Sequence, residues 1–407
     1  MASILVYTSP ARGHLYPVMG VALELRRRGH RVQVRTLAAE VAKVEALGLE
    51  AAPIDPAVEA RELDDWQARS PLKALGRSMT TFADRALHEI GDVQRAIADS
   101  GAEALLVDTN SWGAQAVAEA SGLPWATFQP YFTPLPAEGV PPFGPGFRRA
   151  TGPAGRLRDL AVRPLVTGQM SRLALPGVNA ARARVGLAPL DGIAAFLERP
   201  PRVLYFTVPE LDYPRQAWPP GFRFVGPGTW GPPAQEPVWL ASIDRPIVLV
   251  TCSTERQADG AILEAALAGL PGDGYFVVGT SAAFRPEEVA APTAHTRVER
   301  FIPHDAVLSR ATVVVCHGGM GITQRALSFG VPVVVVPFGR DQLEVARRVE
   351  AAGAGVRLAA RRFDPQRLGS AVRRARPMES GARRIADAFS RVGTSTAADA
   401  FEEILVR

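Results

Sequence analysis

The chain has 407 residues and a formal net charge of +5 at pH 7, and this length is too great for one hydrophobic core but fits two domains. The positive charge does not indicate a nucleic-acid partner, because arginines are spread along the chain among acidic residues, as on a solvated surface. No apolar run approaches the length of a membrane span, and the first apolar segment lacks the basic lead of a signal peptide, so we expect a cytoplasmic protein without an integral membrane segment.

The first predicted element is a buried strand at 3–8, with the sequence SILVYT. The turn PARGHLY at 10–16 follows, and an amphipathic helix is predicted at 17–28. His14 is therefore expected on a loop at the carboxyl end of the strand. An imidazole has an unperturbed pKa of about 6.5, so it can take a proton from a hydroxyl group at neutral pH. The alternative is a solvated or helix-capping histidine.

A second buried strand at 105–109, LLVDT, carries Asp108 at its carboxyl end. In a parallel sheet Asp108 would lie at the same edge as His14. A carboxylate there would fix the tautomer of the imidazole and stabilise its charged form. The alternative is that Asp108 caps the helix predicted to begin near Gly113.

The segment 131–192 is the least regular part of the chain, because its prolines and glycines are expected to break any helix. An irregular segment of this length in a compact protein is usually functional or mobile. It also carries apolar side chains that either bind a ligand or only pack at the surface. These are Phe132, Phe143, Phe147 and Met170.

Prolines and glycines also crowd 209–237, which indicates an interdomain linker. The strand PIVLVTCS at 246–253 then repeats the opening pattern of strand, polar turn and helix. Both halves alternate strands and helices, so the predicted fold class is α/β with two doubly wound parallel-sheet domains facing a cleft. The predicted boundaries are a first domain at 1–215, a linker at 216–236, a second domain at 237–380 and C-terminal helices at 381–407.

The most informative stretch places His317 and a glycine cluster between a buried strand at 312–316 and a predicted helix at 321–329. The free N–H groups in the first turn of that helix, and its dipole, favour an anion. Glycines at this turn allow a diphosphate to approach the backbone closely. They are Gly318, Gly319 and Gly321.

After this helix comes a second buried strand at 331–336, followed by Asp341 and Gln342. These two side chains would lie at the same edge of the sheet as the glycine turn. A diphosphate at the turn and several hydroxyl groups at the Asp-Gln pair describe a nucleotide sugar.

The pattern from Phe301 to Gln342 resembles the donor-binding signature of the GT1 glycosyltransferases, enzymes of the GT-B fold, and especially of their bacterial natural-product branch. Its order and spacing match over roughly the last third of the chain. The resemblance implies two Rossmann-like domains, with the acceptor and the base on the first and the donor on the second. It also implies that the last helix packs back on the first domain.

The resemblance assigns the donor site residue by residue. Phe301 matches a position that stacks on the nucleobase, and Ile302 matches its neighbour, whose backbone binds the base. His317 matches the contact to the diphosphate, while Asp341 and Gln342 match the residues that hold sugar hydroxyls. Ser253 and Thr254 match a second diphosphate turn, with helix capping as the alternative. The predicted donor-binding residues are Phe301, Ile302, His304, His317, Gly318, Gly319, Gly321, Ile322, Ser253, Thr254, Asp341 and Gln342.

Three positions depart from the pattern of the plant members. His304 stands where they carry Gln, Ile322 where they carry Ser or Thr, and Arg325 where they carry a ribose-binding Glu. Ile322 offers a phosphate only its backbone N–H, and Arg325 cannot accept a hydrogen bond from a ribose hydroxyl. A deoxythymidine diphosphate donor, which lacks one ribose hydroxyl, fits this change more easily, with UDP-sugars as the alternative.

For the chemistry, the resemblance implies His14 as base and Asp108 as the acid that orients it. It places the acceptor-binding loops in 131–192, which implies a hydrophobic acceptor near Phe132, Phe143, Phe147 and Met170. No Asp-x-Asp motif occurs, and Cys252 and Cys316 are expected to be small core residues, so no metal and no other cofactor is expected.

The sequence therefore predicts an inverting, metal-independent glycosyltransferase whose partners are a nucleoside diphosphate sugar and a hydrophobic small molecule. One alternative is another GT-B enzyme, such as a sugar-nucleotide epimerase or a cell-wall transferase. A second is a catalytically silent partner of another transferase. The sugar, the acceptor, the attacking atom and the oligomeric state, with a homodimer as one option, stay open.

Overall fold

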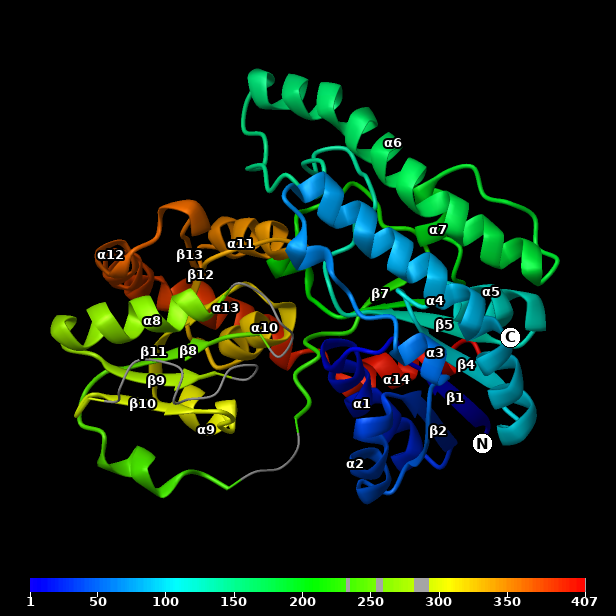
Figure 1. Cartoon of the computed structure of the whole chain (residues 1–407), viewed down its shortest axis with the longest axis horizontal. Coiled ribbons are helices and arrows are strands. Elements are labelled where there is room, and N and C mark those ends of the chain that lie inside the picture. Colours follow the sequence, from blue (N-terminus) through cyan, green and yellow to red (C-terminus); the bar gives the residue numbers. More distant parts are fainter. Residues whose placement is uncertain (232–234, 254–258, 282–292, 407) are drawn as a thin grey trace.

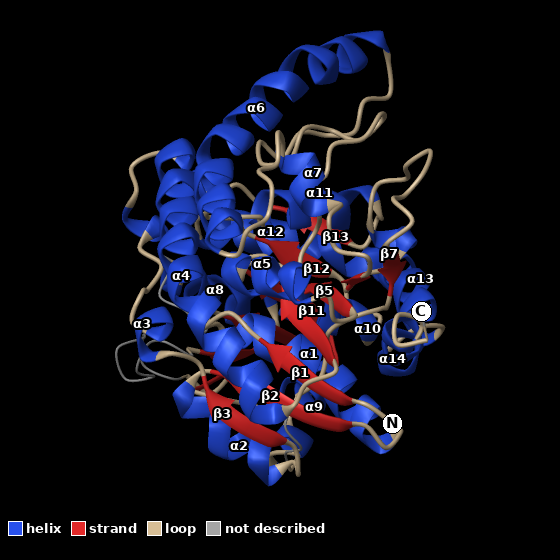
Figure 2. Ribbon diagram, turned by 90° about the vertical axis from the view of Figure 1, so that its right-hand side faces the viewer, coloured by secondary structure: helices blue, strands red, loops and turns tan. Residues whose placement is uncertain are grey.

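The computed structural model describes residues 1–231, 235–253, 259–281 and 293–406. Two parallel β-sheets form the centres of two lobes, and helices cover the sheets (Figure 1). Figure 2 shows the same strands from the side, with helices above and below them. The predicted α/β class with two doubly wound parallel-sheet domains is confirmed.

The first sheet has the strand order β3-β2-β1-β4-β5-β6-β7, and all its neighbouring strands are parallel. Along β1, Leu5 and Tyr7 pack on one face while Ile4 and Val6 pack on the other, because side chains alternate along a strand. Both faces are therefore buried, which explains the continuous apolar sequence. The strands are β1 Ser3–Tyr7, β2 Arg31–Thr36, β3 Glu50–Pro53, β4 Ala104–Asp108, β5 Trp125–Gln129, β6 Val203–Tyr205 and β7 Phe222–Phe224.

The helices of the first lobe connect these strands and cover the sheet. They are α1 Arg12–Arg27, α2 Val41–Ala46, α3 Pro56–Glu59, α4 Pro71–Ser100, α5 Trp112–Ser121, α6 Pro153–Arg184 and α7 Ile193–Leu197. Helices α4 and α6 pack against each other, and one end of α6 extends beyond the two sheets (Figure 1 and Figure 2). In the described parts of the chain, no helix is both long enough and apolar enough to cross a membrane.

The second sheet has the order β10-β9-β8-β11-β12-β13 and is also parallel throughout. Its strands are β8 Ile247–Thr251, β9 Phe276–Thr280, β10 Thr296–Glu299, β11 Ala311–Cys316, β12 Val333–Val335 and β13 Gly355–Arg357. Its helices are α8 Gly260–Gly269, α9 His304–Leu308, α10 Met320–Ser328, α11 Gln342–Ala351, α12 Pro365–Ala375 and α13 Glu379–Ser390.

Each sheet has one position where the strand order reverses, between β1 and β4 in the first and between β8 and β11 in the second. At such a switch point the connections leave the two strands in opposite directions and open a crevice at their carboxyl ends, where ligands of α/β sheets bind. Asp108 is the last residue of β4, and the segments that follow β1, β8 and β11 carry His14, Ser253 and His317. The topology therefore selects the same four positions as the sequence pattern.

The last helix joins the two lobes. Helix α13 packs on α10 of the second lobe, and α14 (Thr394–Glu402) packs on α1 of the first lobe (Figure 1). Phe401 is completely buried in the core on one face of the first sheet, and Arg28 of the first lobe pairs with Asp399 and Glu402.

Two expectations about irregular segments were wrong. The segment 131–192 contains the long helix α6, which begins with Pro153 and continues through Pro164 and Pro176. A proline costs little at the first position of a helix, and packing on α4 offsets the hydrogen bonds lost inside it. The segment 216–236 is not all linker, because β7 within it pairs with β6 as the last strand of the first sheet.

Helix α1 also begins earlier than expected. The prediction took Pro17 as its first residue, but the helix starts at Arg12, so His14 lies in its first turn instead of on a loop. Pro17 lacks only the N–H group that would reach the carbonyl of Gly13, and buried Leu15 anchors the extra turn. The side chain of His14 is thereby fixed by a helix.

Candidate functional site

His14 and Asp108 meet at the switch point of the first sheet. The Nδ1 atom of His14 lies 2.9 and 3.0 Å from the two carboxylate oxygens of Asp108. Asp108 is fully buried at the end of β4, whereas the imidazole of His14 keeps 17% of its surface exposed. This is the arrangement that orients a general base, with one nitrogen held by an acid and the other turned toward a reactant.

The carboxylate of Asp108 has several further donors. It accepts hydrogen bonds from the backbone N–H and the hydroxyl of Ser9, at 3.0 and 2.8 Å, and from the N–H of Asn110, at 2.8 Å. Burial opposes ionisation, but His14 and these donors outweigh it and hold the pKa of Asp108 below its usual value. Helix α5 is not capped by Asp108, because the N–H of Gly113 donates to Glu89.

Asn110 and Tyr131 extend this pair and were not predicted as site residues. The side-chain nitrogen of Asn110 faces Nε2 of His14 at 3.5 Å, and the hydroxyl of Tyr131 donates to the side-chain oxygen of Asn110 at 2.8 Å. The rings of Tyr131 and His14 lie 5.9 Å apart. The sequence offered one signal for these two residues, which is their place near strand ends. Asn110 lies two residues after Asp108, and Tyr131 lies two residues after the end of β5.

His317 and the glycines form a crowded turn at the switch point of the second sheet. His317 follows β11 and is buried, and Gly319 is the N-cap residue of α10. A Cβ atom on Gly319 would come within 2.6 Å of Nε2 of His317, and Gly318 has a φ of 98°. The backbone conformation of Gly318 therefore favours glycine, and a larger residue at Gly319 would displace the imidazole of His317. Gly321 has open space around its Cα, so crowding does not explain that glycine.

Ser253 follows β8 at the same switch point. Its backbone N–H donates to Asp259 at 2.5 Å, and Asp259 also lies 3.6 Å from Nδ1 of His317. Ser253 and His317 therefore contact the same buried carboxyl group. Thr254, the other residue predicted in this turn, lies outside the described residues.

Asp341 and Gln342 lie at the start of α11, beside the glycine turn. Gln342 is buried, and its side-chain oxygen accepts the N–H groups of Phe338 and Gly339 at 2.7 and 3.1 Å. Asp341 occupies the N-cap position, but its side chain makes no capping hydrogen bond. Burial raises the pKa of Asp341, and a backbone N–H and the charge of Arg340 oppose that rise.

Arg340 connects this loop to the first lobe. Its guanidinium binds both carboxylate oxygens of Asp65 at 2.8 Å, and Asp65 is buried. Arg340 has a φ of 51°, a conformation that costs energy for a non-glycine residue and persists only where the surroundings hold it. The pair thus fixes the backbone directly before Asp341 against the first lobe.

The residues predicted at the nucleobase end lie around α9 and α10. The side chain of Phe301 is 68% exposed, as a stacking surface requires, while Ile302 is buried. His304 is the first residue of α9, and burial together with Arg325 lowers its pKa to about 4. Arg325 pairs with Asp305, at 3.1 Å through Nη2. Ile322 lies partly buried on α10 and packs against the core.

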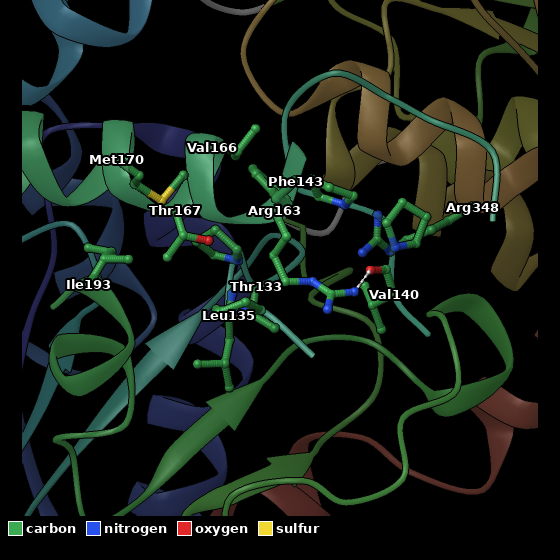
Figure 3. A pocket seen from close by; sticks show the side chains of 14 residues that line it. Thr133, Leu135, Val140, Phe143, Arg163, Val166, Thr167, Met170, Ile193 and Arg348 are labelled. Carbon is green, nitrogen blue, oxygen red and sulfur yellow. Dashed lines mark hydrogen bonds between the residues drawn. The ribbon is translucent and has the colours of Figure 1, made fainter. Parts of the chain in front are cut away.

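A small pocket lies between the 133–143 loop and α6 (Figure 3). Two of the four residues predicted to bind an acceptor, Phe143 and Met170, line it. Its cavity has a volume of about 10 Å³, room for about one water molecule, so a larger ligand requires its walls to move. Its other labelled lining residues are Thr133, Leu135, Val140, Arg163, Val166, Thr167, Ile193 and Arg348.

The other two predicted acceptor residues do not line this pocket. Phe132 is completely buried, and the guanidinium carbon of Arg348 lies 4.4 Å from its ring centre. Phe147 packs in the same manner against Arg158, at 4.6 Å. Both rings support charged groups of the fold, which apolar composition alone did not reveal.

Arg348 ties the pocket to the second lobe. It is completely buried on α11 and pairs with Asp212 of the first lobe at 2.6 Å and with Glu344 at 2.8 Å. Glu344 also accepts the N–H groups of Gly144 and Gly146, at 2.8 and 3.0 Å. The loop that lines the pocket is therefore fastened to the helix that begins with Gln342. In the ranges that the structure describes, no group of three or more His, Cys, Asp or Glu residues could hold a metal ion.

Comparisons with known proteins bear on these observations. The family model described as erythromycin biosynthesis protein CIII-like, C-terminal domain, matches residues 265–399. A 4'-demethylrebeccamycin synthase from Lentzea aerocolonigenes is 32% identical over 385 residues, which cover 91% of each chain.

Solved structures agree in fold. The calicheamicin glycosyltransferase CalG4 aligns with a TM-score of 0.74 and 21% identity over 100% of this chain and 99% of that one. The glycosyltransferase SsfS6 from Streptomyces sp. SF2575, in complex with thymidine diphosphate, aligns with a TM-score of 0.70 and 22% identity over 100% of both chains.

Proposed function

Because the chain belongs to the bacterial natural-product branch of the GT1 glycosyltransferases, we propose that it transfers a sugar from a nucleoside diphosphate to a hydroxyl group of a hydrophobic acceptor, with inversion of configuration. The protein is a glycosyltransferase of natural-product biosynthesis with the GT-B fold. The stereochemistry of the transfer, the residues that catalyse it and the identity of the two substrates are proposed here.

One observation carries the proposal: Nδ1 of the partly exposed His14 is held by the buried Asp108, which leaves Nε2 for a reactant. The loop that carries Asp341 and Gln342 is fastened to the same lobe, because Arg340 pairs with Asp65. An acceptor bound between them would place its hydroxyl near the base and near a sugar held by Asp341 and Gln342. Because both reactants are held close together, the enzyme avoids the entropy cost of bringing two free molecules together in the right orientation.

In the proposed step, Nε2 of His14 takes the proton of the acceptor hydroxyl while its oxygen attacks the anomeric carbon. The bond from that carbon to the diphosphate oxygen breaks on the opposite face, so the configuration inverts. Asp108 keeps the proton on Nδ1 and stabilises the imidazolium. His317 and the N–H groups at the start of α10 stabilise the departing diphosphate, and no metal ion is required.

We favour deoxythymidine diphosphate over uridine diphosphate as the carrier. Arg325 stands where a ribose-binding carboxylate would be expected, and its guanidinium is paired with Asp305. A protein of the same fold is known in complex with thymidine diphosphate. The UDP-sugars are the alternative that a binding measurement decides.

The acceptor is proposed to bind beside the pocket lined by Phe143 and Met170 (Figure 3). The apolar lining supports a hydrophobic aglycone. Because the cavity is almost closed, we expect the 133–143 loop or α6 to move when the acceptor binds. A cytoplasmic location and a homodimer stay predictions.

The test combines binding and transfer. We expect the protein to bind thymidine diphosphate in the presence of a chelator, and His14→Ala to lower kcat by on the order of 10³-fold while the Kd for thymidine diphosphate stays unchanged. His88→Ala is the control, because His88 is an exposed histidine on α4. Calorimetry gives the Kd, and chromatography of the products gives kcat.

Three results would count against the proposal. Full activity of His14→Ala would remove the base from the mechanism. Failure to bind thymidine diphosphate or UDP would argue for another nucleotide or for a silent partner protein. Turnover of a nucleotide sugar without any acceptor would favour an epimerase.

A further inference from the structure

A second His–Asp pair lies at the switch point of the second sheet. The carboxylate of Asp259, directly before α8, is completely buried, and one of its oxygens lies 3.6 Å from Nδ1 of His317. That distance is too long for a hydrogen bond. Among the residues that the structure describes, neither Nδ1 of His317 nor the Oδ1 atom of Asp259 has a hydrogen-bond partner.

Buried polar atoms without a partner are rare in folded proteins, because burial removes their hydrogen bonds to water. Here an imidazole and a carboxylate each carry such an atom beside the turn predicted to hold a diphosphate, although the carboxylate oxygen that lies 3.6 Å from Nδ1 is Oδ2, which Ser253 already contacts. The same carboxylate accepts the N–H of Ser253, so Asp259 contacts both strand-to-helix turns of the switch point. Asp259 therefore lies next to the predicted binding site of the donor diphosphate, and its role is not only to pack in the core.

Burial keeps the imidazole of His317 neutral in this state. Burial, followed by the charge of Arg340, lowers the pKa of His317 to about 4. Burial also raises the pKa of Asp259. The neighbouring thiols are neutral at pH 7, since burial raises the pKa of Cys316 to about 11 and that of Cys252 to about 12.

Resting on the proposed function, we propose that Asp259 is a positioning residue for the donor: when a diphosphate binds, His317 takes up a proton from solvent and forms a closed chain from Asp259 through the imidazolium to a phosphate oxygen. Nδ1–H then donates to Asp259, and Nε2–H donates to the phosphate. The unpartnered Nδ1 atom of His317 gains its hydrogen bond in this event.

The physical reason is the charge that the diphosphate brings. A negative group next to an imidazole favours its charged form, and a carboxylate on the other side adds to the effect. The imidazolium then stabilises the charge that develops on the diphosphate as the sugar leaves. Donor binding would therefore prepare the leaving-group site, which is incomplete before it.

A linked proton has a measurable consequence for affinity. Because the liganded protein holds one more proton than the free protein, raising the pH weakens binding, with a limit of about tenfold in Kd per pH unit where a whole proton is taken up. We expect this dependence to begin above the pKa of free His317, which is about 4, and to end near the raised pKa of the complex.

Calorimetry tests the proposal directly. Thymidine diphosphate glucose and UDP-glucose are suitable probes, because both of their phosphates are esterified and do not titrate near pH 7. Each is titrated into the unmodified protein at pH 7 in two buffers with different ionisation enthalpies. We expect net uptake approaching one proton per bound molecule.

The variant Asp259→Asn should lose this proton uptake and bind the same probe at least about tenfold more weakly at pH 6 than the unmodified protein. Its side-chain oxygen still accepts the N–H of Ser253, so the fold should survive, which circular dichroism checks. Asp273→Asn is the matched control, because Asp273 pairs with Arg373 in the same lobe, away from His317.

The possible outcomes distinguish the role of Asp259 from the proposed function. Binding without proton uptake in the unmodified protein would overturn the role of Asp259 and leave the proposed function intact. Uptake that survives in Asp259→Asn would assign the proton to another group and also overturn it. Failure of both probes to bind would count against the proposed function itself.

Discussion

Each switch point has a histidine facing a buried aspartate, but the two pairs differ in how complete they are. In the first lobe, His14 lies 2.9 Å from Asp108, whose carboxylate also accepts three hydrogen bonds from Ser9 and Asn110. In the second lobe, His317 lies 3.6 Å from Asp259. The first pair is organised before any substrate arrives, whereas the second has room to close on a ligand.

The difference follows from where the acids stand in the chain. Asp108 is the last residue of β4, so the sheet fixes it directly next to the end of β1. Asp259 lies after the connection that leaves β8, immediately before α8. A base needs a fixed geometry for proton transfer, while a phosphate contact tolerates adjustment on binding.

The largest effect that distinguishes the two pairs is expected from Asp108→Asn. An amide at this position no longer stabilises the imidazolium and favours the wrong tautomer of His14. We expect kcat to fall by on the order of 10²- to 10³-fold with no change in the Kd for the donor. Asp259→Asn should show the reverse pattern, with donor affinity affected more than kcat.

Steady-state kinetics at saturating donor, together with calorimetry on both variants, checks this pattern. If both variants lowered kcat equally and left the donor Kd alone, the two pairs would have the same role. Glu62→Gln serves as a control for the loss of a carboxylate, because Glu62 is exposed in the first lobe.

The same comparison explains what the sequence could predict. His14 and Asp108 were found because both adjoin buried strands whose carboxyl ends meet at one edge. Asp259 was missed because its distance from Ser253 and His317 depends on the path of a loop, and no periodic pattern marks it. Tyr131 and Asn110 were missed for a related reason, since their contact joins the ends of two different strands.

The fold was predicted correctly where the local sequence pattern determines the element, and wrongly where tertiary packing does. The parallel sheets follow from runs such as IVLVT at 247–251, which are apolar on both faces. Helix α6 was missed because its prolines argue against a helix, while its packing on α4 is a tertiary contact. The early start of α1 was missed because a proline such as Pro17 usually marks the first turn of a helix.

A smaller effect is expected from Tyr131→Phe, which sharpens the description of the first pair. Without the hydroxyl of Tyr131, the amide of Asn110 is free to rotate away from Nε2 of His14. One neutral hydrogen bond is lost, so kcat should fall by about 3- to 10-fold. The pH profile of kcat/KM should shift, since Asn110 faces the nitrogen that accepts the proton.

Tyr275→Phe is the control, because Tyr275 is buried in the second lobe, away from this site. A profile of kcat/KM unchanged by Tyr131→Phe would show that Tyr131 only supports the fold.

The smallest effect on transfer, and a clear effect on stability, is expected from Glu89→Gln. Glu89 is a buried carboxyl group that accepts the N–H of Gly113 near the start of α5. Burial raises its pKa to about 8, against the attraction of that N–H and of Arg85. Asp108 is equally buried but has the opposite shift, because His14 and further donors face it.

The sign of the pH dependence follows from this raised pKa. The pKa of Glu89 in the folded protein, about 8, is above the unfolded value of 4.5, so its contribution to stability is fully present below pH 4.5 and is lost as the pH rises through 8. Urea unfolding at pH 5 and pH 8.5 should therefore show a smaller loss of stability in Glu89→Gln than in the unmodified protein, by on the order of 1 kcal/mol or more, with kcat at pH 6 unchanged. An equal loss in both would mean that Glu89 is already ionised, and the contrast between Glu89 and Asp108 would disappear.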